Sequence, residues 1–146
     1  MSRDPHPMAP GLAAGITDDT IHTLVHAFYH RVRRDPDLAP VFDAAIDDWA
    51  PHLEKMCAFW SSVVLMTGRY KGTPMQTHAA LPHIGAEHFT RWLELFRTTA
   101  SEVCAPPAAA LFIDRAERIA QSLQLGIALH RGESLVPELR APTSGQ

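Results

Sequence analysis

The amino-acid sequence predicts an all-α protein. Apolar side chains recur three and four residues apart in successive stretches of the chain, and no run of useful length alternates between apolar and polar residues. Proline, threonine and aspartate mark the borders of these stretches, as they commonly do at helix ends. With 146 residues and 46% hydrophobic content, the chain is long enough for one domain with a sizeable core.

The first helix is expected to begin at Thr17, a good N-cap residue that is followed by two acids in the first turn. Tyr29 lies beside its apolar stripe, one turn after Val25. The residue before a proline is pushed out of the helical region, so the helix should stop at Asp35, before Pro36. The apolar stripe consists of Ile21, Leu24, Val25, Phe28 and Val32.

A short apolar turn is expected after this helix, and three further helical patterns follow. One runs from about residue 49 to residue 66, another follows the segment around residue 78, and the last begins at Pro107, a favourable first-turn residue. The apolar residues of the turn and of the three patterns are, in order, Leu38, Val41 and Phe42; Trp49, Leu53, Met56, Phe59, Trp60, Val63 and Val64; Phe89, Trp92, Leu93, Leu95, Phe96 and Val103; and Leu111, Phe112, Ile119, Leu123 and Ile127.

The two ends of the chain are expected to be mobile tails around one domain of residues 16–131. Residues 1–15 contain prolines and glycines without helical or strand periodicity. Residues 132–146 contain Pro137, Pro142 and small polar side chains.

Composition argues against several classes of partner and location. A net charge of −3 and a pI near 6.3 give no positive field for nucleic acid or for a membrane surface. No apolar run approaches the roughly 20 residues that span a bilayer, and the polar start lacks the apolar core of a secretory signal. Cys57 and Cys104 have no CxxC spacing, which leaves a disulfide framework or a thiolate zinc site without support. A reducing, cytoplasmic setting fits these features best.

The segment from Tyr70 to Pro82 contains the most informative histidine. His78 lies there between Pro74 and Pro82, with aromatic-rich helical patterns on both sides. A single histidine without Asp, Glu or Cys at ligand spacing cannot build a zinc or di-iron site, which needs three or more protein donors. It can complete a haem, whose porphyrin supplies the other four nitrogens.

Aromatic and apolar side chains around this segment would line a haem slot, and the alternative is that they form plain core. These residues are Phe42, Phe59, Leu81, Phe89 and Trp92.

Most of the nine histidines have a simpler interpretation, and His52 is the other exception. His52 shares a helix face with Met56, Phe59 and Trp60, so it should point inward. It is either a core histidine with partners for its ring nitrogens or part of a ligand site. Surface or capping roles are expected for His6, His22, His26, His30 and His130.

Five stretches of the sequence follow one another in a distinctive order. They are FYHRVRRDPDLAPVF at 28–42, WAPH at 49–52, FWSS at 59–62, YKGTP at 70–74 followed by His78, and HFTRWLELF at 88–96. Together they closely resemble the group III truncated haemoglobins. The resemblance covers roughly residues 17 to 128, with matching order and nearly gapless spacing.

What the resemblance implies is a shortened globin, in which two helix pairs sandwich a haem b. His78 matches the proximal iron ligand of that family, and Tyr29 matches the tyrosine on the distal first helix. His52 matches the distal-helix histidine, Met56 the apolar residue one turn later, and Trp92 the tryptophan that faces the bound gas. The side chains expected to contact the haem are Phe42, Phe59, Tyr70, Lys71, Met75, Leu81, Ile84 and Phe89.

Within this interpretation, Tyr70 and Lys71 are the best placed in sequence to meet the haem propionates, and the alternative for Lys71 is a solvated loop lysine. Tyr29 and Trp92 are expected to donate hydrogen bonds to a charged ligand. The implied function is reversible binding of dioxygen, carbon monoxide, nitric oxide or a similar small ligand. Two alternatives stay open: a haem enzyme that turns over nitric oxide with dioxygen, or peroxide, with an external reductase; and a haem-free helical module with an aromatic core or partner groove.

Overall fold

The structure is a computed structural model that describes residues 4–70 and 85–130, apart from the side chain of His130. The described part of the chain is all-helical and contains no β-strand, which confirms the predicted fold class. The helices are α1 (Pro10–Ala13), α2 (Asp18–Val32), α3 (Ala39–Ala45), α4 (Trp49–Leu65), α6 (Ala86–Val103) and α7 (Pro106–His130).

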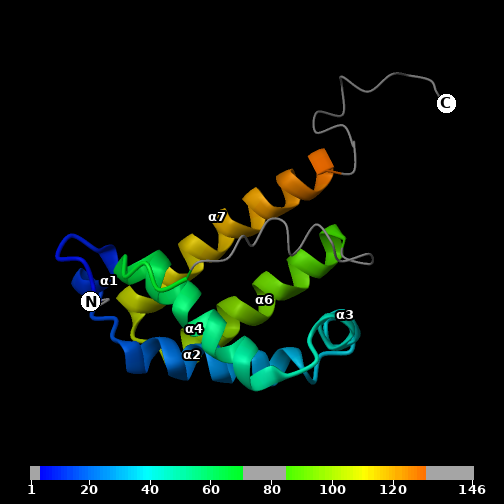
Figure 1. Cartoon of the computed structure of the whole chain (residues 1–146), viewed down its shortest axis with the longest axis horizontal. Helices are drawn as coiled ribbons and strands as arrows, with labels where there is room; N and C mark the ends of the chain where they lie inside the picture. Colours follow the sequence, from blue (N-terminus) through cyan, green and yellow to red (C-terminus); the bar gives the residue numbers. More distant parts are fainter. Residues whose placement is uncertain (1–3, 71–84, 131–146) are drawn as a thin grey trace.

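Two helix pairs make up the body of the molecule (Figure 1). In one pair, α4 crosses α2; in the other, α6 and α7 lie side by side. The pairs meet because α2 also packs against α6 and α4 against α7. The short α3 lies near one end, beyond the C-terminus of α2.

The beginning of α2 follows the prediction from sequence. Thr17 is the N-cap residue: its hydroxyl accepts the Thr20 backbone N–H at 3.2 Å, while the Thr20 hydroxyl accepts the Thr17 N–H at 3.1 Å. Reciprocal capping of this kind satisfies two backbone donors that a helix start would otherwise leave without partners. The helix ends at Val32, shortly before Asp35 and Pro36, as expected.

The segment after α2 differs from its prediction. Instead of a turn, residues 39–45 form a helix of seven residues, with Pro40 in its first turn. A proline is tolerated there because the first N–H groups of a helix have no partner within the helix. The apolar pattern of this segment spans too few residues to distinguish a short helix from a turn.

Part of the expected N-terminal tail is packed against the domain. The His6 backbone N–H donates to the Leu65 carbonyl at 2.9 Å, and both Ala9 and Gly11 are buried. A methyl group added at Gly11 would lie 2.5 Å from the Val64 carbonyl oxygen, so only glycine permits this approach of α1 to α4. Residues 132–146, the expected C-terminal tail, lie outside the described residues.

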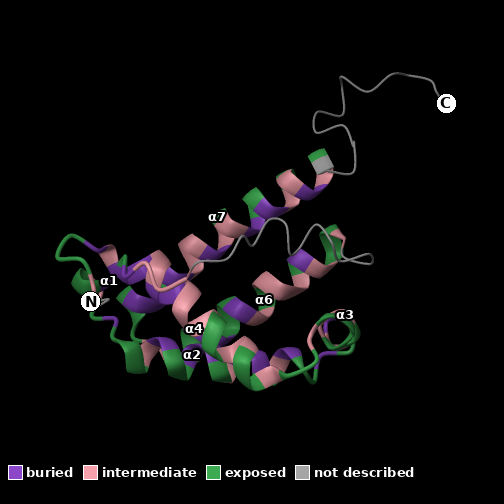
Figure 2. Ribbon diagram, viewed as in Figure 1, coloured by how far each residue is buried: buried purple, intermediate pink, exposed green. Residues whose placement is uncertain are grey.

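The buried residues lie along the helix faces that meet between the two helix pairs (Figure 2). This core is rich in aromatic rings. Phe28, Phe96 and Phe112 are almost completely buried. The Phe96 ring stacks on Trp92, with centroids 5.4 Å apart, and on Trp60, with centroids 5.2 Å apart. This stack joins the middle of the core to Trp92, one of the predicted site residues. None of the described helices is both long and apolar enough to cross a membrane.

Candidate functional site

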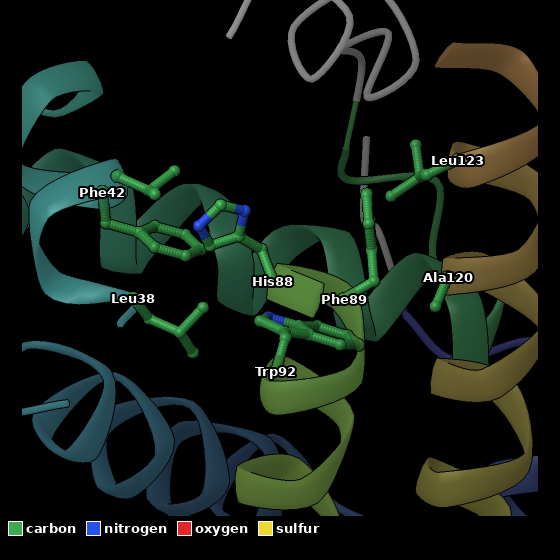
Figure 3. Close-up of a pocket in the computed structure, with 8 residues that line it drawn as sticks. Leu38, Phe42, His88, Phe89, Trp92, Ala120 and Leu123 are labelled. Atoms are coloured by element: carbon green, nitrogen blue, oxygen red, sulfur yellow. The ribbon is translucent and has the colours of Figure 1, made fainter. Parts of the chain in front are cut away.

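A mainly apolar pocket opens between the α3 region, the first turns of α6 and the second half of α7. Its cavity volume is about 40 Å³ and it is partly open to solvent, so the described residues enclose only a small part of the roughly 300–1,000 Å³ of a small-molecule site. Figure 3 shows Leu38 and Phe42 on one side, with Trp92 and Phe89 projecting from α6. The lining residues are Leu38, Val41, Phe42, His88, Phe89, Trp92, Ala120 and Leu123.

Tyr29 lies next to this pocket in a cluster of aromatic rings. Its side chain projects from the buried face of α2, and only 5% of the residue is exposed. The ring centroid lies 6.0 Å from Phe42, 5.9 Å from Trp49 and 5.2 Å from His52. Side chains from α2, α3 and α4 therefore meet around one phenol.

The Tyr29 hydroxyl and the Trp92 side chain, which lines the pocket, are close enough to interact. Burial raises the pKa of Tyr29 well above its ordinary range, and the hydrogen bond with Trp92 offsets this only in part. An indole N–H can only donate, so the Tyr29 oxygen accepts this bond and keeps its own hydrogen for another acceptor. At physiological pH the site thus holds a neutral O–H donor next to an indole.

The imidazole of His52 packs edge-to-face on two aromatic rings. Its centroid lies 5.2 Å from Tyr29 and 5.4 Å from Trp49, at interplanar angles of 86° and 88°. The guanidinium of Arg33 covers Trp49, 4.8 Å from the ring centroid. His52 is thus half-buried beside the phenol. Met56, one turn later on α4, is half-buried against the core.

His88 is a polar residue of the pocket lining that sequence reasoning missed. Its Nδ1 accepts the backbone N–H of Gly85 at 2.8 Å, so a neutral ring carries its hydrogen on Nε2. The side chain is 16% exposed, and Figure 3 shows the imidazole beside the Phe42 ring. The signal in the sequence is weak: a glycine three residues before a histidine at a helix start.

Sequence reasoning also missed several other contributors, each for a local reason. The sequence pattern indicates only a turn for Leu38 and Val41, and only an apolar helix face for Trp49. It indicates a core stripe for Leu123, and Ala120 has no feature that separates it from other small helix residues. Only the packing of α7 against α6 brings Ala120 and Leu123 to the pocket.

Apart from Met56, described above, the predicted site residues fall into three groups. Tyr29, Phe42, His52, Phe89 and Trp92 come together at the pocket and the adjoining aromatic cluster.

Phe59 and Tyr70 form a second contact, separate from the described lining of the pocket. Their ring centroids lie 5.2 Å apart, edge-to-face, and the Tyr70 N–H donates to the Ser62 hydroxyl at 2.9 Å. Burial raises the pKa of Tyr70. The third group lies outside the described residues: Lys71, Met75, His78, Leu81 and Ile84.

The histidines expected at the surface follow their prediction where they are described. His6, His22, His26 and His30 are exposed. The side chain of His130 is outside the described part of the structure.

Comparison with known proteins identifies the family. The model of the family described as bacterial-like globin matches residues 14–124 of this chain. The chain belongs to this family. The group 3 truncated hemoglobin ctb of Campylobacter jejuni is 34% identical to this globin over 113 residues, which cover 75% of this chain and 89% of that protein.

The same relationship is seen in three dimensions. The crystal structure of group III truncated hemoglobin from Campylobacter jejuni is similar to this globin with a TM-score of 0.73 and 34% sequence identity. The match covers 77% of this chain and 91% of that chain. The resemblance to group III truncated haemoglobins and the truncated globin fold are both confirmed.

Membership of the globins implies a haem cofactor and a small diatomic ligand, and the described side chains fit this group. A haem is flat and largely apolar, and the pocket walls offer Phe42 and Phe89 together with aliphatic side chains. The buried Tyr29 hydroxyl next to the pocket is the kind of isolated donor that orients a small polar ligand. Apolar walls with one oriented donor suit a haem globin.

Proposed function

We propose that this globin binds haem b and reversibly binds dioxygen or another diatomic ligand, such as carbon monoxide or nitric oxide. His78 is the proposed iron ligand, and Tyr29, His52, Met56 and Trp92 form the proposed ligand side of the site. When bound, the haem supplies a ferrous iron with one position open to a small ligand.

The buried phenol of Tyr29 is the observation that carries this proposal. A phenol is protonated at neutral pH and burial raises the pKa of Tyr29 further, so its O–H can donate to a ligand that gains negative charge, as dioxygen does from ferrous iron. Trp92 donates to the same oxygen and so orients the phenol. A hydrogen bond to a charged group in a dry pocket is worth about 1.5–3 kcal/mol.

His52 is proposed to control access to the ligand. Its imidazole packs against Tyr29 and Trp49 by ring edges and is only half-buried. A rotation of this side chain would replace its contact with Tyr29 by contact with solvent. Such a movement would open and close a path beside the donor.

Apolar walls and two polar groups are proposed to hold the cofactor. Phe42 and Phe89 line the pocket, which supports their role. Tyr70 and Lys71 are proposed for the propionates. The remaining proposed haem contacts rest on the family resemblance alone: Phe59, Met75, Leu81 and Ile84.

The visible spectrum of the purified protein, with and without carbon monoxide, tests the proposal. A strong Soret band that shifts when carbon monoxide is added to the reduced protein is the expected result. A protein purified from haem-supplemented cells that shows no such band would be a haem-free helical module instead.

A second candidate function is a haem enzyme that turns over nitric oxide with dioxygen, or peroxide, with electrons from an external reductase. The observation that favours it is the imidazole of His52 beside the Tyr29 phenol, since these are two groups that can move protons near one site. Stopped-flow turnover with a reductase tests it: plain reversible binding predicts no catalytic consumption of nitric oxide. A cytoplasmic location and a role in oxygen transport belong to the same set of proposals, and the spacing of Cys57 and Cys104 supports the former.

A further inference from the structure

Asp35, at the corner between α2 and α3, is a buried carboxylate outside the proposed haem and ligand site. Only 2% of its side chain is exposed. Its Oδ2 accepts the backbone N–H groups of Asp37 at 3.1 Å and of Leu38 at 3.0 Å. Leu38 lines the pocket, and α3 with Val41 and Phe42 follows directly. The Oδ2 of Asp35 thus stabilises the turn between α2 and α3, and the residues that follow this turn form one wall of the pocket.

The other oxygen of Asp35 reaches the opposite wall. Arg91 on α6 donates from Nε to Oδ1 over 2.7 Å. Arg91 directly precedes Trp92 and lies one turn after His88, and both of those residues line the pocket. The guanidinium also comes within 3.5 Å of Glu94 on its own helix. A single carboxylate therefore links the two walls between which the pocket opens.

A buried carboxylate strongly restricts where its partners can lie. Removing a charge from water is costly, so an ionised Asp35 needs all three of its donors in place. Burial opposes ionisation of Asp35, but the hydrogen bonds from Arg91 and Leu38 outweigh this effect and lower its pKa. At neutral pH the carboxylate is charged, and charge-assisted hydrogen bonds have narrow distance preferences.

We propose that Asp35 and Arg91 are positioning residues that hold α6 against the α2–α3 corner and thereby keep the Trp92 indole on the Tyr29 hydroxyl. Neither residue has to touch the ligand. The effect of these residues on a bound ligand rests on the proposed function, because the Tyr29 phenol is the proposed donor to that ligand. Their effect on the position of the Trp92 indole can be tested without any ligand.

The central experiment compares Arg91→Met with two control variants. Arg97→Met removes an arginine from the same helix, where Arg97 pairs with Glu117 on α7 at Nε–Oε2 3.1 Å and both side chains are substantially exposed. Thr17→Ala removes the cap of α2 and should lower the stability of the fold. The first control removes an ion pair between α6 and α7, and the second lowers stability away from Asp35.

Two quantities are measured in the carbon monoxide complex and in the dioxygen complex. The first is the ¹⁵N–¹H resonance of the Trp92 indole, assigned with Trp92→Phe. The second is the ratio of dioxygen to carbon monoxide dissociation rates. Arg91→Met should shift the indole resonance and raise the ratio about fivefold or more, since part of a hydrogen bond to a charged ligand is lost. Both controls should leave the two quantities near their wild-type values.

An unchanged indole resonance in Arg91→Met, or equal changes in the controls, would overturn the proposal. If Arg91→Met does not fold, Asp35→Asn gives the same comparison, because its amide oxygen can still accept the backbone N–H groups. If the wild-type protein binds no haem, the proposed function fails, and the indole resonance of the haem-free chain still decides for or against the positioning role.

Discussion

At the scale of single residues, the proposed ligand chemistry depends on the interaction of two side chains that are 63 positions apart in the chain, Tyr29 and Trp92. The indole has only one hydrogen to give, and a bond to the phenol oxygen would use it. We therefore propose a serial arrangement, in which Trp92 orients Tyr29 and Tyr29 donates to the ligand. The sequence alone suggests two parallel donors, which makes a different prediction for a double variant.

Tyr29→Phe should accelerate dioxygen dissociation by about tenfold to 150-fold, the equivalent of the roughly 1.5–3 kcal/mol of a hydrogen bond to a charged group. Trp92→Phe should have a smaller effect in the same direction, because the phenol keeps its O–H but loses its orientation. In the double variant the two effects should not add, because the two groups act through one bond. Stopped-flow dissociation rates check this.

Carbon monoxide is the control ligand for these variants, since it gains little negative charge. Its dissociation rate should change much less than that of dioxygen. If both gases responded alike, in proportion to the cavity created, Tyr29 and Trp92 would be core residues only. Additive effects on dioxygen would instead favour two parallel donors.

His52→Leu should change the rate at which carbon monoxide binds more than the rate at which it leaves. Leucine removes the polar imidazole beside Tyr29 without adding a donor, so the barrier to access changes while the bond to iron does not. Flash photolysis measures the association rate. Equal association rates in the two proteins would make His52 an ordinary core residue.

His78→Ala should lose haem or hold it weakly while the helices survive, because no other histidine of its segment has both the flanking prolines and the matching family position. The nearby His83 offers a matched control, His83→Ala. Haem content and the ferrous spectrum are measured, and far-UV circular dichroism follows the helices. Retention of a normal five-coordinate ferrous spectrum in His78→Ala, together with its loss in His83→Ala, would assign the iron ligand to His83.

At the scale of secondary-structure elements, α1 shows how a very short helix is kept in place. Four residues are too few for a stable helix by themselves, so α1 depends on its contacts with α4. Those contacts depend on Gly11, whose backbone lies close to the Val64 carbonyl. The buried Ala9 and the bond from His6 to Leu65 extend the same contact.

Gly11→Ala should lower the free energy of unfolding by roughly 1–3 kcal/mol, because its methyl group would lie 2.5 Å from backbone that cannot move aside cheaply. Leu12→Ala is the matched control: Leu12 is 44% exposed, and its loss should change stability by no more than about 0.5 kcal/mol. Urea denaturation of the three proteins measures both effects. A Gly11→Ala protein as stable as wild type would mean that α1 contributes nothing to the fold.

At the scale of the whole molecule, the two layers are joined by an aromatic core and by polar links at its edges. The stack of Trp92, Phe96 and Trp60 runs through the centre, while Asp35 and Arg91 join the α2–α3 corner to α6. The core contributes stability that depends little on pH. The carboxylate contributes stability that depends on its charge.

The stability difference between wild type and Asp35→Asn should be largest near neutral pH and should shrink in acid. The folded-state pKa of Asp35 lies below its ordinary value, so its contribution is fully present above the ordinary aspartate range near pH 4 and is lost as the pH falls through the lowered pKa. Urea denaturation of both proteins between pH 7 and pH 2 tests this, since comparison at equal pH cancels other titrations. A pH-independent difference would contradict a charged Asp35.

By itself, the sequence determined the fold class, most helix positions and the family. Apolar spacing located α2, α4, α6 and α7, because each buries a broad stripe whose period is set by the helix itself. Thr17 and Pro36 marked helix borders through local backbone chemistry, which needs no distant partner. Side chains with distinctive chemistry, such as Tyr29 and Trp92, could be selected by their family positions.

Only the tertiary structure decided which side chains meet and in what order they act. Ala120, Leu123 and His88 reach the pocket because α6 and α7 pack side by side, and α1 is held because a glycine lets two backbones approach. Likewise, nothing in the local sequence shows that Asp35 binds an arginine on α6 or that the indole of Trp92 points to a phenol on α2. Periodicity reports only how one segment faces the interior, whereas these contacts depend on the distances between segments, which packing fixes.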